Sequence, residues 1–382
     1  MSMWKVQLCE LYYDHLERDA VSEVLLSEWL TMGERVSTFE NSFSALHGIN
    51  ECCVAVSSAT AGLHLILMAL GIGPGDEVII PGLTFVSDAN VVCQLGAKPV
   101  FADSIGLHDF NVSTESILDK ITNKTRVIVA VHFAGFPNEL SELKKVCDGR
   151  GIFLVEDVAH APGAKINENM CGTLGHAAFY SFFSNKNIAV GEGGMVLTKD
   201  NQLLNRIRSM RSHGMTSVTL DRHKGRADTY GVNEVGLNYR LDELRAAIGS
   251  VQLKKLPMIR DLRGKLFNYY ASQLMKSSVL IPFTDISENT VPAYHIMPII
   301  LPSNCNRSQV IHELRKVGIQ TSIHYPAFHS FHAYQEYIQE GDLPVVDEIT
   351  KRELTLPLHP KMTNEDVDYV CDNLKKVLIH AS

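Results

Sequence analysis

Five short apolar runs, separated by helix-like segments and turns, constrain most strongly what this 382-residue chain can fold into. The runs are CVAVS, EVIIP, KPVFAD, RVIVAVH and IFLVED. Near-continuous apolar strands of this kind are typical of sheets buried on both faces. Their alternation with helical patterns such as LSELKKVCDGRG therefore predicts an α/β fold with a mainly parallel sheet and helices on both faces.

The length of the chain and one long helical pattern suggest two domains. A chain of 382 residues exceeds the usual size of a single domain. The pattern LDELRAAIGSVQLKKLPMIRDLRGKLFNYYASQL leads from one half to the other. We expect a large domain over residues 1–250, including an N-terminal arm, and a smaller domain over residues 251–382. The amphipathic tail NEDVDYVCDNLKKVL is predicted to be the last helix.

Two charged residues stand at positions that suit covalent chemistry on a cofactor. Lys186 lies in SFFSNKNIAVGEGG, on a turn between an aromatic segment and a run of glycines, where its amine is a candidate nucleophile. Asp157 ends the buried run IFLVED and is expected at the carboxyl edge of the sheet. An amine and a carboxylate are the two charged groups that pyridoxal phosphate (PLP) requires. A magnesium site of a nucleotide hydrolase would need the loop G-x-x-x-x-G-K-[ST], which the sequence lacks.

The segment VSSATAGLHLILMAL predicts a helix whose first turn can bind an anion. Ser58 and Thr60 precede apolar residues spaced along one helix face. The free N–H groups of such a first turn, together with hydroxyl groups, suit a phosphate. Ser58 is equally suited to be a plain N-cap, and the two roles use the same donors. Phe85, just beyond the run EVIIP, is a candidate for stacking on a planar cofactor or for packing in the core.

Over nearly its whole length the chain resembles the DegT/DnrJ/EryC1/StrS family of PLP-dependent aminotransferases. Eight blocks in the order typical of the family carry this resemblance: LTMGERVSTFENSF, SSATAGLHLILMALGIGPGDEVIIPGLTF, EDVAHAPGA, SFFSNKNIAVGEGGMV, RSHGM, GLNYRLDELRAAIG, HYPAFH and LPLHPKMTNEDV. The resemblance implies the PLP-dependent aminotransferase fold type I, with a smaller C-terminal α+β domain. It also implies bound PLP and the amination of keto groups on nucleotide-linked sugars.

The same resemblance implies a set of site residues. Lys186 would hold the cofactor as an imine, and Asp157 would face its pyridine nitrogen. Further contacts are implied at Ser58, Ala59, Thr60 and Ser181 for the phosphate, Phe85 for the ring face, His160 for the phenolic oxygen, Asn238 from a neighbouring subunit, and His324 and Tyr325 for the sugar. His160 stands where many relatives have Gln, and Ala59 where Gly is more frequent. A residue shared between subunits implies a homodimer.

The implied reaction is a ping-pong transamination with L-glutamate as the expected donor. A lysine at position 186 favours transamination, because relatives that dehydrate sugars have His there. The tetrad GEGG favours amination at C4 of a 4-keto-6-deoxyhexose, because C3-aminating relatives tend to have Asp in place of Glu192. Amination at C3, amination of a ketocyclitol such as an inosose, and a regulator that only binds PLP remain as alternatives.

Composition and the remaining motifs argue against nucleic acid, a membrane and a metal ion as partners of this chain. A net charge of −8 argues against non-specific nucleic-acid binding, and the basic stretch RHKGR at 222–226 is expected to be a solvated loop. Eight cysteines without a C-x-x-C pair, no signal-peptide core and no run of about 20 apolar residues indicate a cytoplasmic protein without a membrane helix. His324, His329 and His332 suggest a metal site, but Pro326 breaks their helical spacing, so no metal is expected.

Overall fold

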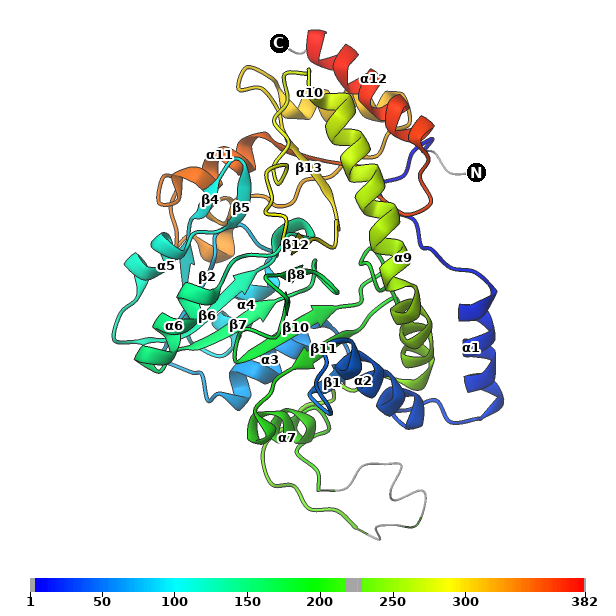
Figure 1. The fold of residues 1–382 in the computed structure, drawn as a ribbon. Coiled ribbons are helices and arrows are strands. Elements are labelled where there is room, and N and C mark those ends of the chain that lie inside the picture. The colour runs from blue at the N-terminus through cyan, green and yellow to red at the C-terminus, as the bar shows by residue number, and fades with distance from the viewer. Residues whose placement is uncertain (1–3, 217–224, 226–228, 381–382) are drawn as a thin grey trace.

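A seven-stranded sheet forms the centre of the computed structural model, which describes residues 4–216, 225 and 229–380 (Figure 1). In spatial order its strands are β1 (Cys53–Val56), β11 (Gly194–Leu197), β10 (Ala177–Ser181), β7 (Phe153–Asp157), β6 (Thr125–Val131), β2 (Glu77–Pro81) and β3 (Lys98–Ala102). β11 runs antiparallel to both of its neighbours, and all other pairs are parallel. All five predicted runs form strands of this sheet, which confirms the α/β prediction. The basic stretch at 222–226 lies outside the described residues except for Gly225.

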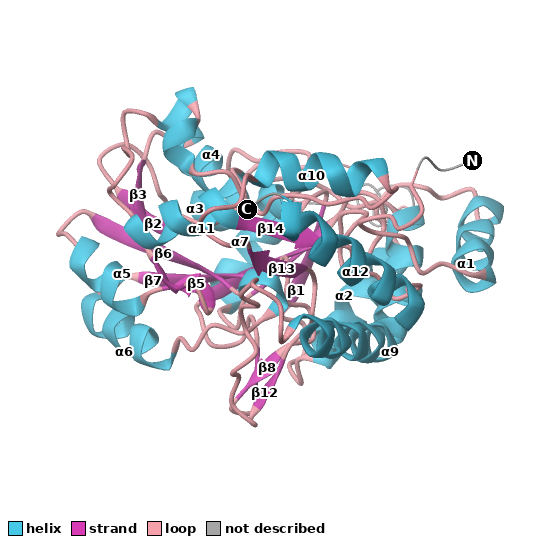
Figure 2. Cartoon of the chain, turned by 90° about the horizontal axis from the view of Figure 1, so that it is seen from above, coloured by secondary structure: helices cyan, strands magenta, loops and turns pink. Residues whose placement is uncertain are grey.

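Helices cover both faces of the sheet, because both faces carry apolar side chains. Along β1, Val54 and Val56 belong to one buried cluster, whereas Cys53 and Ala55 belong to another. The first face is covered by α3 (Ala59–Ala69), α4 (Ser87–Gln94) and α7 (Asn201–Met210), and the second by α2 (Glu34–Leu46), α5 (Thr114–Lys120), α6 (Ser141–Arg150) and α9 (Glu243–Leu274). Figure 2 shows α4 and α6 on opposite sides of the strands. No helix in the described ranges is long and apolar enough to cross a membrane.

The predicted long helix is α9, which has 32 residues. The side chain of Asp242 caps its first turn by accepting a hydrogen bond from the Arg245 N–H. Helices α1 (His15–Leu26) and α2 pack against α9, as does the last helix, α12 (Asn364–His380) (Figure 1). The expected boundary between residues 1–250 and 251–382 falls inside this helix, and the division into two domains stays a prediction.

The remaining C-terminal elements surround a short antiparallel pair of strands, β13 (Met297–Ile300) and β14 (Glu353–Leu356). Helices α10 (Arg307–Lys316) and α11 (Pro344–Arg352) lie in the same part of the chain. The smaller elements are spread along the whole chain. They are β4 (Ser104–Gly106), β5 (Asp109–Val112), β8 (Lys165–Ile166), β9 (Asn169–Met170), β12 (Thr290–Val291) and the 3₁₀ turns η1 (Phe133–Gly135), η2 (Phe328–Ser330) and η3 (His332–Tyr334).

The N-terminal arm joins the C-terminal segment to the loop that carries Lys186. The Val6 N–H donates to the carbonyl of Gly318 at 3.0 Å, and Val6 pairs with Ile319 as an isolated bridge. Further along, the Tyr13 hydroxyl donates to the carbonyl of Ala189, in the lysine loop, at 2.6 Å. The arm therefore packs behind the lysine loop before α1 begins.

Candidate active site

A cavity of about 370 Å³ lies at the carboxyl ends of the parallel strands. Strand ends of this kind collect side chains from several segments at one edge of a sheet. Ten of the eleven predicted site residues line the cavity, namely Ser58, Ala59, Thr60, Phe85, Asp157, His160, Ser181, Lys186, His324 and Tyr325. Residues far apart in the sequence thus meet as predicted, although their individual roles stay predictions.

Asn238 is the predicted residue that the structure does not bring into this cavity. It is exposed and forms an isolated antiparallel bridge with Ser212. Its expected contact with the site of a neighbouring subunit stays a prediction.

The lysine loop is folded back on itself between β10 and β11. The Phe182 N–H donates to the Gly193 carbonyl, and the Val190 N–H donates to the Phe182 carbonyl, both at 2.9 Å. Lys186 closes a tight turn within this loop, because its own N–H donates to the Phe183 carbonyl at 2.9 Å. Removal of the amine from water lowers the pKa of Lys186 to about 8, although the Asp157 carboxylate opposes this shift. An amine with this pKa is partly neutral near pH 8, as a nucleophile or base must be.

His295 is the hydrogen-bond partner of the Lys186 amine. The distance from Lys186 Nζ to His295 Nε2 is 3.4 Å, and His295 Nδ1 lies 3.3 Å from Asn187 Oδ1. Because Asn187 Nδ2 donates to the Ala293 carbonyl at 2.7 Å, its Oδ1 faces the ring and accepts from Nδ1–H. His295 Nε2 therefore carries a lone pair and accepts from Lys186. Burial, together with the charge of Lys186, holds the pKa of His295 well below its usual value, so the ring stays neutral.

Asp157 ends β7 with its carboxylate at the cavity. Its Oδ1 accepts a hydrogen bond from the Ala159 N–H at 2.8 Å. Burial raises the pKa of Asp157 to about 6, and the Ala159 amide and the charge of Lys186 limit the rise. Above pH 6 this residue is therefore a buried carboxylate that would be stabilised by a cationic ring nitrogen.

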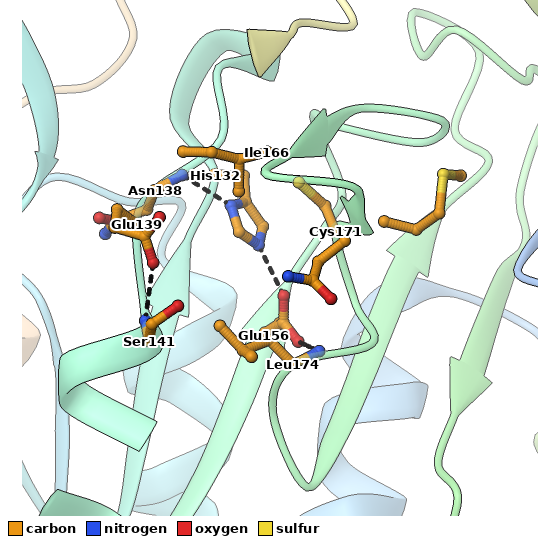
Figure 3. Close-up of a pocket in the computed structure, with 10 residues that line it drawn as sticks. His132, Asn138, Glu139, Ser141, Glu156, Ile166, Cys171 and Leu174 are labelled. Carbon is orange, nitrogen blue, oxygen red and sulfur yellow. Dashed lines mark hydrogen bonds and ion pairs between the residues drawn. The ribbon is translucent and has the colours of Figure 1, made fainter. Parts of the chain in front are cut away.

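The neighbouring residue, Glu156, fixes the end of β7 from the other face of the sheet (Figure 3). His132 Nε2 lies 2.9 Å from its Oε2. Three backbone N–H groups of residues 172–175 donate to its carboxylate at 2.6–2.9 Å. His132 Nδ1 in turn accepts from the Asn138 N–H at 2.9 Å. Glu156 is thus a fully hydrogen-bonded structural anion.

The turn between β1 and α3 has the features of an anion-binding helix start. Ser58 is the N-cap, and its hydroxyl accepts from the Ala61 N–H at 3.1 Å, so the capping role is present. Strand β11 passes so closely that a Cβ at Gly194 would lie 2.6 Å from the carbonyl carbon of Ser58 and 2.7 Å from the amide nitrogen of Ala59. Glycine is therefore required at position 194 for this packing.

Two side chains at the cavity are open to contact with a ligand: the ring of Phe85 is exposed, and one ring nitrogen of His160 lacks a hydrogen-bond partner among the described residues. The ring of Phe85 is 55% exposed, which is high for a phenylalanine beside a buried strand end. His160 is almost fully buried; its Nε2 lies 3.0 Å from the Tyr325 hydroxyl, while its Nδ1 has no hydrogen-bond partner among the described residues. A buried ring nitrogen without a partner is costly unless a ligand supplies one.

These features fit pyridoxal phosphate. The cavity offers an amine with a lowered pKa, a buried carboxylate, a helix start for a phosphate, a free aromatic face and an unpaired imidazole nitrogen. The described residues contain no group of three or more His, Cys, Asp or Glu side chains that could hold a metal ion. The three histidines that suggested a metal site have separate partners, which are Thr355 for His324, Asp347 for His329 and Gln335 for His332.

Sequence reasoning missed several polar residues at or next to the cavity. Thr84 and Asn185 line it, and His295 touches Lys186 beside it. Asp88 is completely buried and accepts a 2.7 Å hydrogen bond from the hydroxyl of Thr84. Thr84 and Asn185 lie within blocks that carry the family resemblance, but nothing in those blocks sets them apart as cavity residues. His295 and Asp88 are single polar residues outside these blocks.

Comparison with known proteins agrees with this geometry. The model of the DegT/DnrJ/EryC1/StrS aminotransferase family matches residues 12–375. The spore coat polysaccharide biosynthesis protein SpsC of Bacillus subtilis is 35% identical over 370 residues, which cover 95% of this chain and 94% of SpsC.

Two solved structures are similar over nearly their whole length. A Streptococcus pneumoniae protein classed as a sugar aminotransferase, in its pyridoxamine phosphate form, superposes with a TM-score of 0.91 at 26% identity and 99% coverage of both chains. The Escherichia coli GDP-4-keto-6-deoxy-D-mannose-3-dehydratase with bound hydrated PLP has a TM-score of 0.88 at 26% identity and covers 98% of this chain and 100% of its own. The chain therefore belongs to the DegT/DnrJ/EryC1/StrS aminotransferase family, the PLP-dependent sugar aminotransferases.

Proposed function

We propose that this protein transfers the amino group of L-glutamate to the C4 keto group of a nucleotide-linked 4-keto-6-deoxyhexose by a ping-pong mechanism. The main support is one cavity that gathers Lys186, Asp157 and the turn at residues 58–60. Glu192, on which the preference for C4 rests, lines the same cavity. The name of the E. coli relative also describes a nucleotide-linked 4-keto-6-deoxy sugar.

The proposed roles of the cofactor contacts follow their chemistry. Bound PLP supplies an aldehyde that condenses with amines and a protonated ring that withdraws electrons from the substrate. Asp157 keeps the proton on the ring nitrogen, and Phe85 packs on the ring face. Residues 58–60, together with Ser181, hold the phosphate. The unpaired Nδ1 of His160 supports this residue as the contact for the phenolic oxygen.

Lys186 is the proposed proton carrier of the reaction. Its Nζ removes the proton from the α carbon of the amino-acid donor once the amine is free. His295 Nε2 keeps a lone pair directed at that amine. Among the residues that the structure describes, Lys186 therefore has a neutral acceptor and no negatively charged group in hydrogen-bond contact. A salt bridge to a carboxylate would instead stabilise the charged form and raise the pKa of the lysine.

We also propose that the active protein is a cytoplasmic homodimer with shared sites. Asn238 is exposed outside its own cavity, as expected for a residue that serves a partner. Nearby Val232 and Val235 are 60% and 83% exposed, which suits a surface covered by a second subunit. The eight cysteines are all free, which supports a reducing compartment.

Two measurements with the purified holoprotein test this function. L-Glutamate added alone should convert the bound cofactor from its aldehyde to its amine form, with a change in absorbance and release of one 2-oxoglutarate per site. A 4-keto-6-deoxyhexose nucleotide added next should restore the first spectrum, and NMR of the product should place the new amine on C4.

The alternatives give different results in the same assay. A 3-keto sugar nucleotide or an inosose that restores the spectrum faster than the 4-keto sugar would replace the proposed substrate. Failure of any amino acid to convert the cofactor would favour a regulator that only binds PLP.

A further inference from the structure

His324 is positioned by β14. Residue Ser322 forms an isolated bridge with Thr355, and their backbones exchange hydrogen bonds at 3.1 and 2.9 Å. This bridge brings His324 beside β14, where its own N–H donates to Glu353 Oε2 at 2.9 Å. His324 Nδ1 lies 2.8 Å from Thr355 Oγ1, and the ring lines the cavity. With Nδ1 turned to Thr355, Nε2 is the ring nitrogen left to face a ligand.

Glu353 and Thr355 form a buried pair on one side of β14. They are two residues apart, so their side chains point to the same face of the strand. Both are completely buried, and the Thr355 hydroxyl donates to Glu353 Oε1 at 2.5 Å. Arg307 is nearby, but its Nη1 donates to the backbone carbonyl of Glu353 and not to the carboxylate. Within the described part of the chain, the carboxylate is therefore held by His324 N–H and Thr355 alone.

When Glu353 is ionised, it can only accept hydrogen bonds, and these contacts then determine which nitrogen of His324 carries the proton. A hydroxyl group has one proton to donate, and Thr355 gives it to Glu353. The contact between Thr355 and His324 must then be a donation from Nδ1–H to the hydroxyl oxygen. Burial and the charge of Lys186 lower the pKa of His324 to about 3, so the ring is neutral and Nε2 has no proton.

We propose that the Glu353 carboxylate, when ionised, and Thr355 are positioning residues that hold His324 in its Nδ1–H form, so that Nε2 accepts a hydrogen bond from a hydroxyl group of the sugar substrate. The identity of the ligand as a sugar rests on the proposed function, whereas the position of the ring proton does not. Because Nε2 accepts a hydrogen bond here, the site favours ketosugars that have a hydroxyl group directed at His324. A ligand that lacks this hydroxyl would leave the buried nitrogen unpaired.

The first test is NMR of the holoprotein with ¹⁵N-labelled histidine, which reads the protonated nitrogen directly. His324→Gln removes the signals of His324 and thereby assigns them. Because burial raises the pKa of Glu353 to about 8, the spectra are recorded at pH 9, where it is ionised. The wild type and Thr355→Ser, which keeps the hydroxyl, should both show Nδ1–H.

Glu353→Gln should invert this pattern. The Gln oxygen is needed by the His324 N–H, so its NH₂ group donates to Thr355, and the Thr355 hydroxyl then donates to His324 Nδ1. The ring proton moves to Nε2. Nε2–H in the wild type, or an unchanged ring in Glu353→Gln, would overturn the proposal. Thermal unfolding of the variants, which should be cooperative, shows that they are folded.

The second test is a comparison of KM and kcat for the sugar substrate at pH 9, where Glu353 is ionised. Loss of one hydrogen-bond acceptor should raise KM on the order of tenfold in Glu353→Gln, with a smaller effect on kcat. An inverted ring with an unchanged KM would refute sugar recognition through His324. If no sugar is aminated by the wild type, the proposed function fails, while the NMR result still decides the position of the proton.

Discussion

The carboxylates of Glu156 and Asp157, which are consecutive residues of β7, serve opposite faces of the central sheet. Side chains alternate along a strand, so two neighbouring acids cannot enter the same cavity. Asp157 lines the proposed cofactor cavity, and Glu156 lines a small pocket behind it with His132 (Figure 3). Asp157 is thus expected to serve the reaction, whereas Glu156 stabilises the fold. Variants of Asp157 should mainly change activity, and variants of Glu156 should mainly change stability.

Asp157→Asn should remove activity without weakening the fold. The neutral amide cannot keep a proton on the ring nitrogen, so turnover should fall on the order of 10³-fold. The pKa of Asp157 is raised in the folded state, so its contribution to stability is lost as pH rises through about 6. At pH 8 the cofactor-free variant should therefore be more stable than the wild type, on the order of 1–3 kcal/mol. Steady-state rates and urea unfolding at pH 8 measure both effects; wild-type turnover would show that another group faces the ring.

Glu156→Gln should have the opposite profile. Gln has one acceptor oxygen where the carboxylate has two, so at least one buried N–H loses its partner, at a cost of about 1–3 kcal/mol. Burial alone would raise the pKa of Glu156, but hydrogen bonds from His132 and backbone amides lower it overall. This stability is present above the ordinary pKa and lost as pH falls through the lowered one, so the two proteins should converge in acid. Urea unfolding at pH 7 and pH 4 tests this; equal stability at pH 7 contradicts it.

Lys186→Ala should abolish the covalent link to the cofactor and lower turnover by at least about 10³-fold, because it removes both nucleophile and base. Lys199→Ala is the matched control, since Lys199 is exposed and its amine donates to the Thr173 carbonyl at 2.8 Å. Borohydride reduction followed by peptide mass mapping should label position 186 in the wild type and the control. A label elsewhere, or yellow active protein in Lys186→Ala, would refute the assignment.

Uptake of PLP by the cofactor-free protein should depend on the pKa of Lys186. Only the neutral amine attacks an aldehyde, and burial lowers this pKa to about 8. The rate should rise about tenfold per pH unit below pH 8 and level off above it. Stopped-flow absorbance between pH 6.5 and 10 follows the reaction. A rate that still climbs at pH 10 would indicate an ordinary lysine.

Gly194→Ala should weaken cofactor binding through the backbone. The added Cβ would lie 2.6 Å from the Ser58 carbonyl carbon, so the turn before α3 must move, at a cost of about 1–3 kcal/mol. Gly149→Ala is the control, because Gly149 lies in α6 and a new Cβ there would meet no other described part of the chain within 4 Å beyond its own helix; this variant should be neutral or slightly stabilising. Fluorescence titration with PLP and thermal unfolding compare the two. Equal PLP affinity in both variants would contradict the role of this packing.

Much of the fold followed from local patterns. Five strands were predicted because both faces of the sheet are buried, and such strands are visible as unbroken apolar runs. β10 and β11 were not predicted, because AAFYS and GMVL are short and flank a loop whose glycines dominate the pattern. Lys186 and Asp157 could be paired in advance because each lies at a sheet edge next to a recognisable segment.

The partners of these residues could not be predicted. His295 reaches Lys186, and Asn187 fixes its ring, over a sequence separation of more than a hundred residues. Glu353 and Thr355 read as ordinary polar residues of a short strand, and only burial reveals that their hydrogen bonds are directed at His324. Contacts of this kind depend on how distant segments meet, which local sequence patterns do not encode.

The N-terminal arm also has a practical consequence for work with this protein. Val6 pairs with Ile319, and Tyr13 is hydrogen-bonded to Ala189 in the lysine loop. An affinity tag or a fusion partner at this end could therefore disturb the contacts that support the loop carrying Lys186. The other end of the chain is better suited to such additions, because Ile379 near the end of α12 is 74% exposed.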